Sequence, residues 1–112
     1  MDRKALIRQY KETPRPAGVY RVLNTRSSKA LVGTSPDAPA MLNRIRAQLR
    51  MGAHPNRDLQ QDWSSDGPDG FIFEVLDVLE PKDGADTDPA EELRLLEEMW
   101  IERLQLSAAF RY

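Results

Sequence analysis

Two short apolar runs separated by a polar turn constrain the fold of this chain most strongly. The first run begins at Gly18–Tyr20, the second holds Leu31–Gly33, and the polar residues Asn24–Ser28 lie between them. Short runs rich in β-branched and aromatic residues on either side of such a turn are typical of a β-hairpin. We therefore predict antiparallel strands over about 18–23 and 30–34.

Apolar spacing and capping residues place the remaining elements around this hairpin. Helices are predicted over 2–11, from about 35 to 51, over 56–64 and from 88 to about 106. A third strand is predicted over Phe71–Leu79, where both faces are apolar, so we expect it to be central and covered on both sides. The order α-β-β-α-α-β-α predicts an α+β fold, with helices flanking a small three-stranded mixed or antiparallel sheet.

Length and composition narrow the class of protein. A chain of 112 residues forms one domain, here 1–112. No apolar run approaches the roughly 20 residues that a membrane helix needs. Charged residues interrupt the apolar pairs of the N-terminus, which therefore does not resemble a secretory signal. The chain has no Cys and one His, which disfavours disulfides and a zinc cage. We expect a cytoplasmic protein with no membrane partner.

The charges divide unevenly along the chain. Residues 1–57 hold 12 Lys and Arg against 3 Asp and Glu, whereas residues 58–112 hold 4 against 15. A basic half of this kind favours a nucleic-acid partner. The alternative is that the two halves neutralise each other within one compact domain. Both interpretations stay open, because neighbours in sequence need not be neighbours on the surface.

Several motifs in this order resemble the GIY-YIG nuclease domain, over about residues 17–105. The matching segments are Gly18–Tyr20, Leu31–Ser35, Met41–Ile45, Gly52–Asn56, Phe71–Leu76 and Glu97–Ile101, together with Leu59, Gln60 and Trp63. The resemblance implies a fold used by endonucleases that cleave phosphodiester bonds of DNA or RNA with Mg²⁺ or Mn²⁺. Such chemistry needs an oriented attacking group, a cation for the developing charge and a hard oxygen ligand for the metal.

Carried over residue by residue, the resemblance retains only part of the family's active site. Tyr20 and His54 take catalytic positions, and Glu97 takes the position of the metal-binding glutamate. Apolar residues take three other positions: Leu31 stands for the second tyrosine, Met41 for the arginine and Ile45 for a histidine or tyrosine. Arg44 is a candidate substitute for the missing arginine.

Two of the three apolar replacements, Met41 and Ile45, lie on the same helical face. Met41, Leu42, Ile45 and Leu49 fall on one arc about 100° wide. The face that would direct cations at a phosphate is thus an apolar stripe, and Leu31 faces it from the hairpin. Loss of such an electrostatic clamp typically costs orders of magnitude in rate. These positions therefore indicate a degenerate nuclease site.

Each remaining candidate has a structural alternative. Glu97 lies within the apolar arc of the last helix, where it would bind either a metal or a buried partner. His54 could be a loop residue beside a helix C-terminus. Phosphate binding is possible for Arg44, Arg46, Arg50 and Arg57, or they form a solvated face. Trp63 and Trp100 are predicted to be core residues, and Glu74 to form a cross-strand pair.

Three functional interpretations follow from these residues. The first is a nucleic-acid-binding or accessory protein of this fold with weakened or lost nuclease activity. The second is an active metal-dependent endonuclease with a rearranged site built on Tyr20, His54 and Glu97. The third is a protein-interaction or regulatory domain without a nucleic-acid role.

Overall fold

The computed structural model describes residues 16–80 and 89–112, so the helix predicted over 2–11 lies outside the described residues. The described elements are β1 (Gly18–Asn24), β2 (Ala30–Ser35), α2 (Ala38–Arg50), α3 (Arg57–Asp66), β3 (Phe71–Val78) and α4 (Pro89–Arg103). Short 3₁₀ turns precede β3 at Pro68–Gly70 and follow α4 at Ala108–Phe110. Each predicted element within the described ranges is present, with ends that differ by a few residues.

The three strands form one antiparallel sheet in the order β2-β1-β3. The hairpin is confirmed, with Tyr20 opposite Gly33 and Val22 opposite Leu31. The prediction that the third strand is central is wrong, because β1 occupies the centre and β3 is an edge strand. Apolar residues on both faces of β3 did not require burial on both sides, since Ile72 remains 45% exposed.

Local chemistry sets the ends of α2 and α3. The Asp37 carboxylate accepts a hydrogen bond from the Ala40 N–H at 3.2 Å and caps the start of α2. Gly52 follows the end of α2 with φ of +71°, a conformation that side chains rarely adopt. The Asn56 side chain accepts from the Leu59 N–H at 3.1 Å and caps α3. Sequence signals thus locate both helices because their caps are local.

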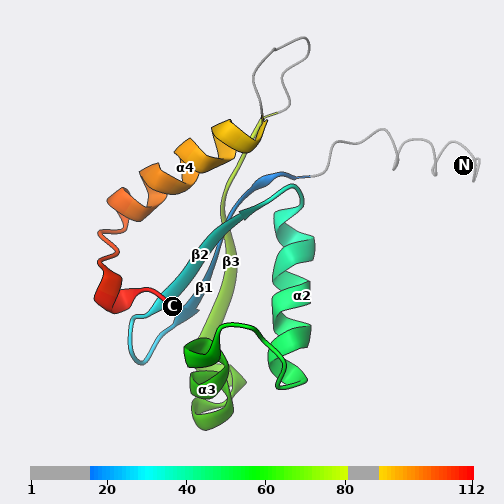
Figure 1. The fold of residues 1–112 in the computed structure, drawn as a ribbon, viewed down its shortest axis with the longest axis vertical. Helices are drawn as coiled ribbons and strands as arrows, with labels where there is room; N and C mark the ends of the chain where they lie inside the picture. The colour runs from blue at the N-terminus through cyan, green and yellow to red at the C-terminus, as the bar shows by residue number, and fades with distance from the viewer. Residues whose placement is uncertain (1–15, 81–88) are drawn as a thin grey trace, which may run out of the picture.

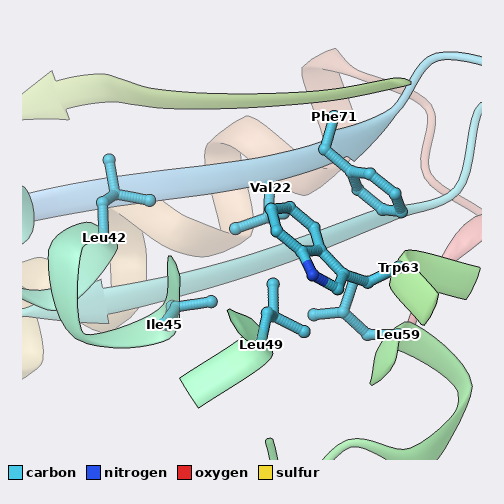
Figure 2. Close-up of a cluster of buried hydrophobic side chains, with 7 residues drawn as sticks. All are labelled: Val22, Leu42, Ile45, Leu49, Leu59, Trp63 and Phe71. Atoms are coloured by element: carbon cyan, nitrogen blue, oxygen red, sulfur yellow. The ribbon is translucent and has the colours of Figure 1, made fainter. Parts of the chain in front are cut away.

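Helices cover the sheet on both faces, with α2 on one side and α4 on the other (Figure 1). The α2 side holds the larger cluster of buried side chains, which Figure 2 shows: Val22, Leu42, Ile45, Leu49, Leu59, Trp63 and Phe71. On the α4 side, Val19, Ala30 and Val32 pack against Leu96, Trp100 and Ile101. Both tryptophans therefore pack with the core, as predicted.

Side chains alternate along β1 between these two clusters. Tyr20 and Val22 pack on the α2 side, whereas Val19 and Leu23 pack on the α4 side. Arg21 lies opposite Glu74 of β3, and its Nε donates to Glu74 Oε1 at 2.6 Å. Arg21 is thus the cross-strand partner predicted for Glu74. Because each charge has a partner, the pair lies in the middle of the sheet without an unpaired buried charge. Among the helices of the described residues, none is long and apolar enough to span a membrane.

Candidate nucleic-acid site

Tyr20 is held across the neighbouring strand by the absence of a side chain at Gly33. A β-carbon on Gly33 would lie 2.5 Å from Tyr20 Oη and 2.7 Å from its Cζ. These distances are far below a normal van der Waals contact, so the observed ring position requires glycine at 33. The hairpin register, which pairs Tyr20 with Gly33, thus directs the phenol over β2.

The electrostatic surroundings of Tyr20 keep its phenol protonated. Burial raises the pKa of Tyr20 above its ordinary value of 10.0, and the negative charge of Glu97 raises it further. Glu97 projects from α4 and is half-buried. Within 16–80 and 89–112, its carboxylate forms neither an ion pair nor a side-chain hydrogen bond. The fold therefore brings Tyr20 and Glu97 within electrostatic reach of each other.

Apolar side chains fill the junction between the hairpin and α2. Ile45 is 3% exposed within the main cluster, and the half-buried Leu31 and Met41 pack against the same cluster. Tyr20 contacts it too. Met41 and Ile45 thus belong to one apolar face of α2, as the helical projection predicted, and Leu31 packs against the same cluster. Leu31, Met41 and Ile45 carry no charge that could bind a phosphate at this junction.

His54 lies in the loop after α2 and takes part in local hydrogen bonds. Its Nδ1 accepts from the Asn56 N–H, and its own backbone N–H donates to Gln60 Oε1, both at 3.0 Å. Gln60 in turn donates from Nε2 to the carbonyl oxygen of Leu49 at 3.0 Å. Burial lowers the pKa of His54 below 6.5. A neutral imidazole that accepts at Nδ1 fits this loop.

His54 and Tyr20 lie toward opposite ends of α2. Tyr20 is paired with Gly33 near the end of β2, which leads into the first turn of α2, whereas His54 follows its last turn. The helix has 13 residues and is therefore about 20 Å long. The structure thus places Tyr20 with Glu97 but gives His54 a separate set of partners.

The described residues do not fit a metal cage built by the protein. No group of three or more His, Cys, Asp or Glu side chains gathers anywhere in residues 16–80 and 89–112. Near Tyr20, Glu97 is the carboxylate to which the resemblance assigns metal binding. One carboxylate is the minimum for Mg²⁺, which keeps several waters and relies on substrate oxygens for the rest.

The four candidate arginines do not form one patch. Arg44 lines an open hollow of about 250 Å³ at the start of α2, next to Ser35 at the end of β2. Arg46 points the other way, with its Cζ 4.5 Å from the centre of the Phe73 ring on β3. Because β2 and β3 are the two edges of the sheet, Arg44 and Arg46 lie on opposite flanks of α2.

No ion pair uses any of these arginines within the described parts of the chain. The ion pairs there join Arg21 to Glu74, Arg26 to Asp66, and Arg94 to Glu91 and Glu98. The segment Met41–Arg57 contains four arginines and no Asp or Glu. The described acidic residues therefore form no ion pair with this basic segment.

Sequence reasoning missed two contacts that need the folded chain. The tail residue Tyr112 donates from Oη to Asp62 at 2.6 Å and accepts from Asn24 Nδ2 at 3.0 Å. Its backbone N–H also donates to the carbonyl oxygen of Ala30 at 3.0 Å. Phe73 likewise gave no signal as the partner of Arg46. Both contacts join residues far apart in sequence, which local spacing does not reveal.

Comparison with known proteins identifies the fold. Neither a protein-family model nor a curated protein sequence matches this chain. The catalytic domain of the homing endonuclease I-TevI matches with a TM-score of 0.65 and 22% identity, over 85% of this chain and 96% of that one. A mutant catalytic domain of the intron endonuclease I-TevI matches with a TM-score of 0.66 and 23% identity, over 87% and 91%. The chain has a GIY-YIG-like fold.

The GIY-YIG-like fold confirms the resemblance inferred from the hairpin motifs. At this level of identity the likeness concerns the backbone arrangement, and function has to be argued from the side chains. In this GIY-YIG-like domain the side chains form three groups. They are the apolar junction between the hairpin and α2, the Tyr20 phenol with the Glu97 carboxylate whose charge raises its pKa, and the arginines of α2.

Proposed function

We propose that this protein binds nucleic acid and that its GIY-YIG-like site has weakened or lost nuclease activity. The observation that carries the proposal is the basic segment Met41–Arg57, whose arginines form no ion pair among the described residues. Unpaired guanidinium groups can neutralise backbone phosphates and release counterions, which drives sequence-independent binding. The partner is DNA or RNA.

The apolar hairpin–α2 junction supports the loss of cleavage. The transition state of phosphodiester cleavage carries extra negative charge, which an active site must stabilise with cations or hydrogen-bond donors. Leu31, Met41 and Ile45 supply neither. Tyr20 with its raised pKa stays neutral near pH 7, so it can donate a hydrogen bond but is not available as a phenolate base.

A second candidate function is a metal-dependent endonuclease with a rearranged site. The proximity of Glu97 to Tyr20, expressed in the raised pKa of Tyr20, favours this candidate. Activity of this kind would require Mg²⁺ or Mn²⁺, with Glu97 as its protein ligand. His54, the third residue of this candidate site, has hydrogen bonds within the α2–α3 loop.

Fluorescence anisotropy tests the binding proposal. Labelled single-stranded DNA, duplex DNA and single-stranded RNA are titrated with the protein at several salt concentrations without divalent metal. We expect binding that weakens linearly in a plot of log K against log salt. Absence of binding to all three probes contradicts the proposal and favours a protein-interaction or regulatory domain.

A further inference from the structure

We propose that the phosphate backbone docks on the β3 flank of α2, at Arg46 and Arg50, and not on the β2 flank where the family's arginine position lies. This inference rests on the proposed nucleic-acid binding and assigns it to one side of one helix. The two flanks differ in how their cations are held, in their neighbouring carboxylates and in their exposed groups.

Arg46 is held in place by an aromatic platform. Its Cζ lies 4.5 Å from the centre of the Phe73 ring, which is a cation–π contact, and the residue is half-buried. A guanidinium that rests on a ring keeps N–H donors at its edge, where a phosphate can accept two parallel hydrogen bonds. Because the side chain is already ordered, less conformational entropy is lost when a phosphate binds.

Arg50 continues the same flank one helical turn later. Residues four apart on a helix are neighbours, with Cβ atoms about 5–6 Å apart. Arg50 is exposed and has no carboxylate partner among the described residues. Two arginines one helical turn apart on the same flank can contact neighbouring phosphates.

Several described carboxylates of β3 and α3 are engaged with other side chains. Glu74 of β3 pairs with Arg21 on the α4 side, Asp62 accepts from Tyr112, and Asp66 pairs with Arg26. Asp58 is exposed in the first turn of α3, directly after Arg57. The β3 flank of α2 itself carries no acidic side chain.

The β2 flank has the opposite character. Arg44 shares its hollow with Asp37, whose carboxylate caps α2, and with the apolar Met41. Glu97 adds a negative charge that acts on Tyr20 over β2. Asp37 lines the same hollow as Arg44, and the charge of Glu97 acts on Tyr20, so negative charge on this flank disfavours a phosphate there. Electrostatics therefore directs the backbone to the β3 flank.

Charge reversals on the two flanks distinguish these sites. The Arg46→Glu and Arg50→Glu variants are compared with Arg44→Glu, a matched control on the same helix, using labelled single-stranded and duplex DNA. We expect each β3-flank variant to weaken binding by about tenfold or more and to reduce the salt slope by about 1. Arg44→Glu should weaken binding clearly less than either of these variants.

A second pair of variants tests the aromatic platform without changing charge. Arg46→Lys keeps the cation but loses the planar stack, and Phe73→Leu removes the ring. Both should weaken binding several-fold, and more than Arg50→Lys, which makes the same change of residue type away from the ring. Thermal unfolding confirms that each variant is folded. If Phe73→Leu fails to fold, the comparison of Arg46→Lys with Arg50→Lys decides alone.

Each other outcome overturns a defined part of the account. If Arg44→Glu weakens binding as much as Arg46→Glu, the β3-flank assignment is wrong although the protein binds nucleic acid. The same holds if neither β3-flank reversal has an effect on a protein that binds. If the unchanged protein binds neither these DNA probes nor single-stranded RNA, the proposed function itself is wrong.

Discussion

The ring of Tyr20 lies over Gly33 so closely that any side chain at position 33 would collide with it. This contact joins the two strands of the hairpin and fixes the position of the Tyr20 phenol, whose pKa the charge of Glu97 raises. It also explains why the second apolar run ends in glycine, since the phenol occupies the space that a β-carbon would fill.

Gly33→Ala should destabilise the protein by about 1–3 kcal/mol, the usual cost of forcing extra volume into a packed site. Urea unfolding of the variant and the unchanged protein measures the difference in the free energy of unfolding. In a Tyr20→Ala background the same substitution should cost markedly less, because the colliding ring is gone. An equal cost in both backgrounds would show that the two residues do not interact.

The apolar hairpin–α2 junction predicts the effect of restoring polar groups to it. Ile45→His places an imidazole where the side chain is 3% exposed, which should lower the free energy of unfolding by about 2–4 kcal/mol. Leu31→Tyr and Met41→Arg, at half-buried positions, should each cost less. A triple variant as stable as the unchanged protein would contradict the packing described for this junction.

The hairpin, α2 and α3 could be predicted because their determinants are local. The polar turn after Asn24, the Asp37 and Asn56 caps and the glycine after α2 each act within a few residues. Sheet order was not predictable in the same way. The centre of the sheet depends on pairing partners across many residues, and a central strand can hold a charge such as Arg21 once Glu74 faces it.

In the candidate site, too, local features could be predicted from the sequence and contacts between distant residues could not. The shared apolar contact of Met41 and Ile45 follows from helical periodicity, which is local. Helical periodicity already separates Arg44 from Arg46 by about 200°, but which strand each of them faces could be seen only in the fold. The hydrogen bonds of His54 depend on the loop conformation that links α2 to α3.

His54 should titrate below pH 6.5, because burial lowers its pKa and protonation at Nδ1 breaks the bond from Asn56. The chain has one histidine, so proton NMR reports its ring without overlap. The contribution of His54 to stability is complete above pH 6.5 and is lost as the pH falls through the lowered pKa. A midpoint at or above 6.5 in the folded protein would contradict the burial of the imidazole.

Ionisation of the Tyr112 phenol should lower the stability of the protein at alkaline pH. Burial and the hydrogen bond to Asp62 raise the pKa of Tyr112 to about 12. Because the folded pKa exceeds that of an unfolded tyrosine, near 10, this stabilisation is complete below pH 10 and is lost as the pH rises toward 12. Ultraviolet titration of the phenolate should show one transition near 12 that Tyr112→Phe removes. Asp62→Asn should move that transition downward.

Cleavage of labelled DNA and RNA under single-turnover conditions tests the central claim most directly. The unchanged protein and Glu97→Gln are incubated with each labelled substrate in Mg²⁺ and in Mn²⁺, at protein concentrations that saturate binding. The account predicts bound substrate that remains intact, or a trace of cleavage that is the same in both proteins. Cleavage by the unchanged protein that Glu97→Gln abolishes would contradict it and establish a metal-dependent endonuclease.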